Sequence, residues 1–335
     1  MTSPSRIETL PIESAALKGN RLGDPHQREL TVYLPAGYDE QAERRYPVCF
    51  LLSSHGRTSY YHISWNQWDE TLPQRLDRLI RTGQMPPVIV ALPEAWTRFG
   101  GSQYLDSAIG NYASYLIGEL VPLVDSTYRT LPSREHRGIL GHSSGGYGAL
   151  VHAMQHPDVF GAIGCRAGDM YWEYTAIPGL SHFHQQIEKW GGIAEFIAKI
   201  PEIQPKGGAF WEAIHTVMQS MAYATNPTSP LGFDPPIDLE TGAIIPEVWA
   251  RWLEFDPVRM IDRPEYQAAL KTMKSVFIEV GRFDEYQLQV GSRLLHRKLD
   301  QYGVAHIYEE FPDGHRDTHY RYDVAFPVIV KALSL

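Results

Sequence analysis

Hydrophobic positions along the chain follow two patterns that predict strands and helices in alternation. Short apolar runs are typical of strands buried on both faces, and helical spacing of apolar residues marks amphipathic helices between them. The expected strands lie at residues 29–34, 48–52, 88–92, 138–140, 160–163, 275–280 and 306–311. The expected helices lie at residues 68–82, 112–128, 147–155, 286–301 and 320–335. This alternation predicts an α/β fold with a doubly wound, mostly parallel sheet.

The alternation stops between about Asp169 and Asp256, where no buried strand run occurs. Five of the eight tryptophans lie in this segment, namely Trp172, Trp190, Trp211, Trp249 and Trp252. We expect a helical cap that is inserted into the sheet domain. The expected boundaries are residues 1–168 and 257–335 for the α/β core and residues 169–256 for the cap.

Within the expected cap, apolar spacing predicts helices at residues 187–200 and 210–223. The Pro- and Gly-rich stretch from Asn226 to Pro246 is typical of a loop region, with a small hairpin expected around Thr241-Gly242. An insertion at this point of a parallel sheet is expected to lie over the carboxyl ends of the strands.

Composition and charge indicate which binding partners and which cellular compartment to expect. The formal net charge of −9 argues against nucleic acid or an anionic membrane as a partner. No run of about 18 apolar residues occurs, so no membrane span is expected, and no apolar segment near Met1 predicts a signal peptide. Cys49 and Cys165 lie in apolar runs, which predicts buried free thiols and a cytoplasmic protein. Homo-oligomerisation stays open.

A strand-to-helix turn is predicted at Gly141-His142-Ser143-Ser144-Gly145-Gly146. The spacing Gly-x-Ser-x-Gly, with Ser143 at its centre, is typical of a nucleophilic serine held on a sharp turn. Glycines at positions 141 and 145 lack Cβ, so the strand and the helix can pass close to the serine. Ser144 does not fit this register, because its flanking residues would be His142 and Gly146. A Gly/Ser-rich turn without chemistry would show the same short motif.

A carboxylate and an imidazole follow two later strands. Asp284 comes after the strand expected at residues 275–280, and His315 comes after the last expected strand. The chain order Ser143, Asp284, His315 is the order expected of an α/β-hydrolase. His315 would then take the serine proton and Asp284 would orient the imidazole. The neighbouring Glu285 is the alternative acid.

Two histidine pairs have a spacing that could suit a metal ion. His319 lies four residues after His315, and His152 and His156 have the same spacing. Neither pair has the glutamate of a zinc protease motif or an obvious third ligand. We therefore expect neither a metal nor another cofactor.

Several motifs together carry a family resemblance. They are Tyr33-Leu34-Pro35-Ala36-Gly37-Tyr38, Asp106-Ser107, Glu119-Leu120-Val121-Pro122, Tyr128-Arg129-Thr130, the turn segment 141–150 and Gly314-His315. This set resembles the esterase D-like branch of the α/β-hydrolases, which includes S-formylglutathione hydrolases, feruloyl and acetylxylan esterases, enterochelin-type esterases and mycolyltransferases. The resemblance covers most of the chain outside the expected cap. It implies an α/β-hydrolase fold and a metal-free Ser-His-Asp hydrolase.

The chain departs from this family pattern at two places near the expected site. Members commonly have Met or Leu where Ser144 stands, and Ser53-Ser54 precede His55-Gly56 in the first oxyanion loop. The backbone N–H of Ser144, at a helix N-terminus, is one expected oxyanion donor. Counting from Leu51-Leu52 gives His55 as the second donor, whereas anchoring on His55-Gly56 gives Arg57. His55 is favoured.

Five residues are candidates for the substrate pocket: Trp65, Trp68, Asp106, Trp172 and Trp211. For the first three, core packing or a plain loop turn is the alternative. Aromatic residues of the cap predict an apolar wall for short-to-medium acyl or aryl esters. The predicted function is that of a carboxylic-ester hydrolase acting on small molecules. The alternatives are an acyltransferase to an alcohol, an S-formylglutathione-type thioesterase, or a catalytically silent binding protein on a hydrolase scaffold.

Overall fold

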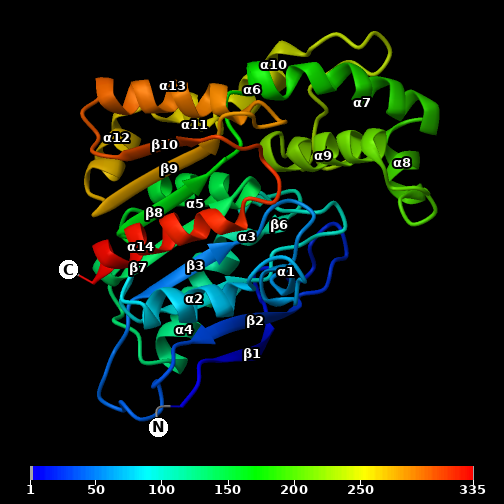
Figure 1. Cartoon of the computed structure of the whole chain (residues 1–335). Helices are drawn as coiled ribbons and strands as arrows, with labels where there is room; N and C mark the ends of the chain where they lie inside the picture. Colours follow the sequence, from blue (N-terminus) through cyan, green and yellow to red (C-terminus); the bar gives the residue numbers. More distant parts are fainter. Residues whose placement is uncertain (1–2, 335) are drawn as a thin grey trace.

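An eight-stranded sheet forms the centre of the computed structural model, which describes residues 3–334 (Figure 1). The strand order is β1-β2-β4-β3-β7-β8-β9-β10, with β1 and β2 antiparallel to their neighbours and the other strands parallel. The strands are β1 (Arg6–Glu13), β2 (Gln27–Leu34), β3 (Val48–Leu52), β4 (Ile89–Pro93), β7 (Arg137–His142), β8 (Ala162–Arg166), β9 (Ser275–Gly281) and β10 (Ile307–Phe311). The predicted mostly parallel α/β-hydrolase sheet is confirmed. Residues 1, 2 and 335, at the ends of the expected core and of the last expected helix, lie outside the described residues.

Strand β1 was not predicted from the sequence. It is an edge strand that pairs with β2 alone, and none of its side chains is fully buried. The strands inside the sheet are different, because β3 and β4 are buried along their whole length. Continuous burial makes a strand visible as an apolar run, whereas an edge strand with polar side chains resembles a loop.

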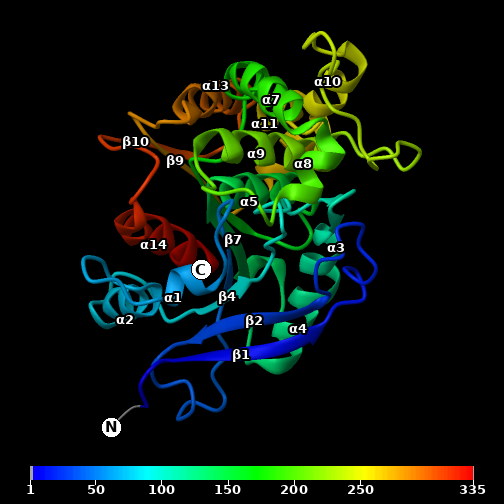
Figure 2. The same ribbon diagram turned by 90° about the vertical axis from the view of Figure 1, so that its right-hand side faces the viewer.

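Helices cover both faces of the sheet (Figures 1 and 2). On one face, α2 (Leu72–Arg81) and α14 (Tyr322–Leu333) pack over Leu51, Leu140 and Phe277. The other face is covered by α5 (Ser144–Gln155) and by further helices whose apolar residues join one large core. These are α3 (Tyr112–Ser114), the π-helical turn Tyr115–Leu120, α4 (Val121–Thr127), α11 (Pro257–Met260), α12 (Pro264–Lys271) and α13 (Leu288–Gln301). The short elements are α1 (Tyr60–Ile63), β5 (Asp106–Ser107), β6 (Gly110–Asn111) and the 3₁₀ turns Arg134–His136 and His319–Arg321.

Two of the expected helices differ most from the structure. The helix expected from residue 68 begins only at Leu72, because Thr71 caps it and forms a reciprocal capping box with Gln74. The helix expected at 187–200 is broken in the middle. Gly191 and Gly192, with φ of 83° and 119°, separate α7 (Ile177–Trp190) from α8 (Ile193–Lys199).

The segment between β8 and β9 contains five helices before the chain returns to the core. They are α6 (Trp172–Thr175), α7, α8, α9 (Gly208–Tyr223) and α10 (Pro246–Leu253). Helices α7 to α10 lie beyond the carboxyl ends of the parallel strands (Figures 1 and 2). The expected hairpin is reduced to one bridge between Ile237 and Ile244 around a turn. Within residues 3–334, no helix is long and apolar enough to cross a membrane.

Asp256 joins the beginning and the end of this helical segment. Its fully buried carboxylate accepts hydrogen bonds from the backbone N–H groups of Tyr171, Trp172 and Val258, at 2.9, 3.0 and 3.0 Å. Burial raises the pKa of the carboxyl group, and the three N–H donors oppose that rise. One side chain therefore satisfies three backbone donors that would otherwise be buried without acceptors.

Replacement of Asp256 by Ala should lower the free energy of unfolding by about 3 kcal/mol, because several buried donors lose their acceptor. Urea unfolding measures this loss as a fall in the transition midpoint. Asp238→Ala is the matched control, since exposed Asp238 also accepts two backbone N–H groups, those of Glu240 and Thr241. The control should lose much less stability. Equal losses in the two variants would contradict the assigned role of Asp256.

Candidate active site

Three strand ends bring the predicted chemical groups to one edge of the sheet. Ser143 directly follows β7, Asp284 lies three residues after β9, and His315 lies four residues after β10. Because these strands are parallel, their carboxyl ends meet at the same edge, where α/β proteins bind ligands.

Ser143 occupies a strained turn between β7 and α5. Its backbone has φ 58° and ψ −126°, a conformation that a non-glycine residue adopts only where the surrounding structure enforces it. Its N–H donates to the carbonyl of Arg166 at 2.9 Å. A Cβ on Gly145 would lie 2.2 Å from the Leu52 carbonyl oxygen, and a Cβ on Gly141 would lie 2.4 Å from the Gly145 carbonyl carbon. Both positions therefore require glycine.

His315 and Asp284 contact each other through their side chains. His315 Nδ1 lies 2.7 Å from Asp284 Oδ2, and the carboxylate is almost fully buried. The other carboxylate oxygen accepts from the Tyr286 N–H at 2.9 Å, and the Tyr286 ring lies edge-on to the imidazole at 4.8 Å. The carboxylate assigns the proton to Nδ1 and leaves Nε2 as the acceptor.

Glu285, the alternative acid, has a different contact. Its Oε2 accepts the backbone N–H of His315 at 2.5 Å, and this hydrogen bond lowers the pKa of the Glu285 carboxyl group. Glu285 thus holds the main chain of the histidine loop, while Asp284 holds the imidazole ring. The motif analysis did not predict this backbone role.

His142 is a second residue that the sequence analysis missed. Its ring centroid lies 4.4 Å from that of His315. The Ser54 hydroxyl donates to the His142 carbonyl at 2.9 Å and lies 3.1 Å from His142 Nδ1. Burial lowers the pKa of His142 well below 6.5, and the neighbouring His315 lowers it further. His142 is therefore neutral, so it adds no second positive charge beside His315. Its position inside the turn motif was the only available sequence signal.

The backbone N–H groups of the loop after β3 are not equally available to a substrate. The N–H of Gly56 donates to the Gly100 carbonyl at 2.7 Å, and the N–H of Arg57 donates to the Ser54 carbonyl at 3.1 Å. Within residues 3–334, the backbone N–H of His55 has no hydrogen-bond acceptor. Of the two oxyanion candidates in this loop, only His55 has an uncommitted N–H.

A small cavity connects this loop with the start of α5. It measures about 10 Å³, at most room for one water molecule, and its lining includes His55, Arg57 and Ser144. Ser144 is the first residue of α5, where backbone N–H groups point out of the helix without intrahelical acceptors. A larger hollow of about 630 Å³ shares no lining residue with this cavity. Its lining comes mainly from the end of β1 and the start of β2, and it includes Tyr60 of α1 and Trp96.

Trp211 on α9 lies against the loop after β3. Its ring centroid is 5.6 Å from that of His55, and a Cβ on Gly56 would lie 3.1 Å from the indole. The indole is 45% exposed, so part of its apolar face remains open. Burial and the nearby His215 lower the pKa of His55 to about 3, so this imidazole is neutral.

The other pocket candidates lie elsewhere. Trp172 is fully buried and stacks on Tyr223 at 4.3 Å, so it belongs to the core of the helical segment. Trp65 and Trp68 are 77% and 87% exposed, which excludes core packing for both. The Asp106 carboxylate accepts from the backbone N–H and hydroxyl of Ser114 at 2.9 and 2.6 Å, the contacts of a plain turn. These contacts give Trp172 and Asp106 structural roles, and a part for either in a substrate pocket stays a prediction.

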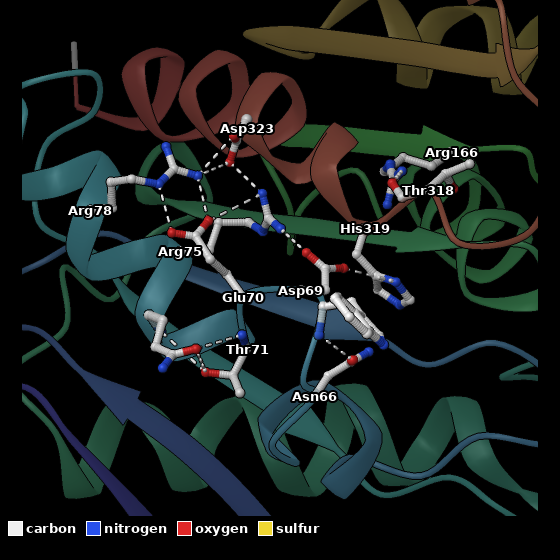
Figure 3. Close-up of polar contacts among 12 residues, drawn as sticks. Asn66, Asp69, Glu70, Thr71, Arg75, Arg78, Arg166, Thr318, His319 and Asp323 are labelled. Atoms are coloured by element: carbon white, nitrogen blue, oxygen red, sulfur yellow. Dashed lines mark hydrogen bonds and ion pairs between the residues drawn. The ribbon is translucent and has the colours of Figure 1, made fainter.

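His319 belongs to a polar network between α2 and α14, shown in Figure 3. Its Nδ1 lies 3.7 Å from Asp69, which also pairs with Arg75 at 2.9 Å. Arg75 and Arg78 in turn contact Asp323 at 2.7 and 2.8 Å. The contacts of His319 are separate from the contact between His315 and Asp284.

The other histidine pair lies at the carboxyl end of α5, with His152 in its last turn and His156 at its C-cap. The rings of His152 and His156 are 5.4 Å apart, and His152 Nε2 is 3.0 Å from the Tyr104 carbonyl oxygen. Burial lowers the pKa of His152 to about 3. His152 is therefore a neutral core side chain hydrogen-bonded to the backbone.

Comparison with known proteins gives the family. A family model described as Putative esterase matches residues 23–333. The chain belongs to this family. It is 28% identical over 154 residues to an endo-1,4-beta-xylanase/feruloyl esterase of Xylanibacter ruminicola and 26% identical over 141 residues to an esterase of Mycobacterium tuberculosis. Each match covers 42% of this chain but only 19% and 28%, respectively, of the relative. The resemblance to the esterase D-like branch is confirmed.

Solved structures give the fold. A ferulic acid esterase superposes with a TM-score of 0.62 at 18% identity, over 98% of this chain and 99% of its own. An S-formylglutathione hydrolase from Agrobacterium tumefaciens superposes with a TM-score of 0.60 at 14% identity, over 99% and 97% of the two chains. At these identities the likeness shows the α/β-hydrolase fold and does not choose between the two activities.

Replacement of Glu285 by Ala should lower kcat for p-nitrophenyl acetate by about tenfold to a hundredfold with little change in KM. The reason is that a displaced His315 costs rate rather than ester binding. Glu285→Gln keeps an oxygen acceptor for the His315 N–H and should recover most of the loss. A Glu285→Gln variant as impaired as Glu285→Ala would contradict a positioning role through this hydrogen bond.

Proposed function

We propose that the chain is a serine carboxylic-ester hydrolase in which Ser143 is the nucleophile, His315 the general base and Asp284 the residue that orients the base. The observation that carries the proposal is the strained serine turn at the same sheet edge as a buried His-Asp pair. Membership of the esterase family supports the same reaction class. A catalytically silent protein would have no need to maintain this strain beside an oriented imidazole.

In the proposed first step, the Ser143 oxygen attacks the acyl carbonyl carbon while His315 Nε2 takes the hydroxyl proton. The tetrahedral intermediate collapses, the bond to the alcohol oxygen breaks, and the imidazolium returns its proton to that oxygen. Water then attacks the acyl-enzyme by the same route and releases the acid and Ser143. Asp284 stays ionised throughout and stabilises the imidazolium through Nδ1–H.

Two backbone donors would stabilise the negative oxygen of each tetrahedral intermediate. We assign these to the N–H groups of Ser144 and His55. The Ser144 N–H lies at a helix N-terminus, where the helix dipole also favours negative charge. The Arg57 N–H is already hydrogen-bonded to the Ser54 carbonyl, which argues for His55. One such donor is typically worth about 10²–10³ in kcat.

The neutral state of His142 favours the same mechanism. The proposed reaction creates a positive charge on His315, whose ring lies 4.4 Å from that of His142. A charged His142 would oppose that imidazolium by like-charge repulsion. Because burial keeps His142 neutral, the repulsion is absent.

Short-to-medium acyl or aryl esters are the proposed substrates. Trp211 offers a partly exposed apolar face beside the proposed oxyanion loop. Three lysines of the helical segment do not gather in one place: Lys189 and Lys199 lie over the Trp190 ring, and Lys206 donates to the Ile203 carbonyl. These three lysines therefore form no cluster of cations for the carboxylates of S-formylglutathione. An acyltransferase would use the same acyl-enzyme, with an alcohol replacing water.

Replacement of Ser143 by Ala should lower turnover of p-nitrophenyl acetate by about 10³-fold or more and leave the melting temperature nearly unchanged, since the nucleophile is lost without a core contact. A fluorophosphonate probe should label the wild type at Ser143, as peptide mapping by mass spectrometry would report. Ser144→Ala is the matched control and should keep the label. Labelling of Ser144 in the wild type would refute the assigned register.

Replacement of Trp211 by Ala should reduce the preference for p-nitrophenyl butyrate over the acetate by about fourfold for each methylene that loses its contact, at about 0.8 kcal/mol per methylene. Measurement of kcat/KM for both esters gives the ratio. Trp68→Ala removes an indole that is 87% exposed and should leave the ratio unchanged. Wild-type kcat/KM should also be higher for the butyrate ester than for S-formylglutathione. Tenfold faster turnover of the thioester would overturn the substrate proposal while preserving the serine mechanism.

A further inference from the structure

Two histidines and an aspartate gather where α13 ends and β10 begins. His296 and Asp300 lie one turn apart on α13, and His306 directly precedes β10. Their ligand atoms lie within 4.8 Å of one another, and no other group of three such residues occurs in the part of the chain from residue 3 to 334. The nearest approach is 2.7 Å, between His296 Nδ1 and His306 Nε2.

The hydrogen bond of His306 leaves its Nε2 atom free to bind a metal ion. His306 Nδ1 lies 2.8 Å from the Val304 carbonyl oxygen, to which it donates its proton. Since a neutral imidazole carries one N–H, Nε2 then has a lone pair directed toward the cluster. Metal-binding histidines commonly use the same device, in which a carbonyl bonded to one nitrogen fixes the other as the ligand.

The remaining two ligands differ in rigidity. The His296 ring stacks on Tyr308 at 4.4 Å and 8°, which fixes its plane beside His306. The Asp300 oxygens lie 3.6 Å from His296 Nε2 and 4.0 Å from His306 Nε2, and this side chain is 64% exposed. A carboxylate with that freedom can rotate toward an ion held by the two imidazoles.

We propose that His296, Asp300 and His306 form a Zn²⁺ site. Two imidazole nitrogens and one carboxylate oxygen are the donor set that suits Zn²⁺, whereas Mg²⁺ and Ca²⁺ require oxygen ligands. Water completes a tetrahedral shell with metal–nitrogen distances of about 2.0–2.1 Å. On binding, the His296 Nδ1 proton moves through solvent to Nε2, beside Asp300, so the ring stays neutral.

The site lies at the opposite end of β10 from His315, because His306 precedes the strand and His315 follows it. Zinc bound there joins the last turns of α13 to the start of an edge strand that pairs with β9 alone. The site is therefore separate from the proposed catalytic groups, and zinc binding there does not depend on the proposed hydrolase activity. A ligand that binds only the folded state raises the apparent stability of that state.

Isothermal titration of the full chain with Zn²⁺, and melting curves with and without the ion, test the proposal. We expect one site that His306→Asn weakens by at least about tenfold, and a rise of several degrees in melting temperature at about a hundredfold excess of Zn²⁺ over Kd. The asparagine amide can still donate to the Val304 carbonyl, which protects the fold. Asp300→Asn changes an exposed group and gives a second variant, which should also weaken binding.

His182→Asn is the matched control, since exposed His182 forms a pair with Glu212 at 2.9 Å and has no third ligand. It should bind Zn²⁺ as the wild type does. Mg²⁺ should cause no rise in melting temperature. Absence of Zn²⁺ binding, or Zn²⁺ affinity unchanged in both His306→Asn and Asp300→Asn, would overturn the proposal. Because the readouts are binding and melting, these outcomes are independent of whether the chain hydrolyses esters.

Discussion

The close passage of α5 over the ends of β3 and β7 is the constraint on which the candidate site depends. Gly145 on the helix lies against the Leu52 carbonyl at the end of β3, and Gly141 on the strand lies against Gly145 itself. Ser143, in the tight turn between these two glycines, has a strained backbone with φ 58° and ψ −126°. The close passage also brings the helix N-terminus, with its uncommitted N–H groups, beside the loop after β3. The close approach of helix and strands thus positions both the proposed nucleophile and the proposed oxyanion donors.

A buried ion pair holds the histidine side of the site. Arg166, at the end of β8, lies 2.5 Å from Glu279 on β9 and donates to the Thr318 carbonyl at 2.7 Å. Arg321 pairs with the same carboxylate at 2.7 Å. Since an isolated buried charge is costly, these groups are stable only as a set. The set fixes the chain just after His315 to two central strands, which explains how a loop residue can keep a defined distance from Asp284.

The helical segment is joined to the core through aromatic packing. Trp172 and Tyr223 stack on each other, and both rings lie about 6 Å from Tyr147 on the serine helix. Tyr147 and Trp172 are fully buried, so this contact is a continuous core rather than a loose interface. Trp211 differs, because its place near the exposed end of α9 leaves it half in solvent above the His55 loop. The place of each tryptophan in the fold, and not its residue type, therefore distinguishes the structural Trp172 from Trp211, the candidate substrate contact.

The sequence by itself determined the parallel sheet, the serine turn and the chain order of serine, acid and histidine. These features are encoded locally, by apolar runs and by glycines at fixed spacing around Ser143. Only the tertiary structure decided the contacts between segments distant in sequence: the hydrogen bond of Glu285 to the His315 backbone, the contact between the tilted rings of His142 and His315, and the burial of Trp172 in contrast to the exposure of Trp68. The physical reason is that the identity of a tryptophan or an acidic residue does not reveal whether its side chain is exposed to solvent or buried in the core. The contacts of such a side chain depend on how strands and helices pack against one another. No short stretch of the sequence determines that packing.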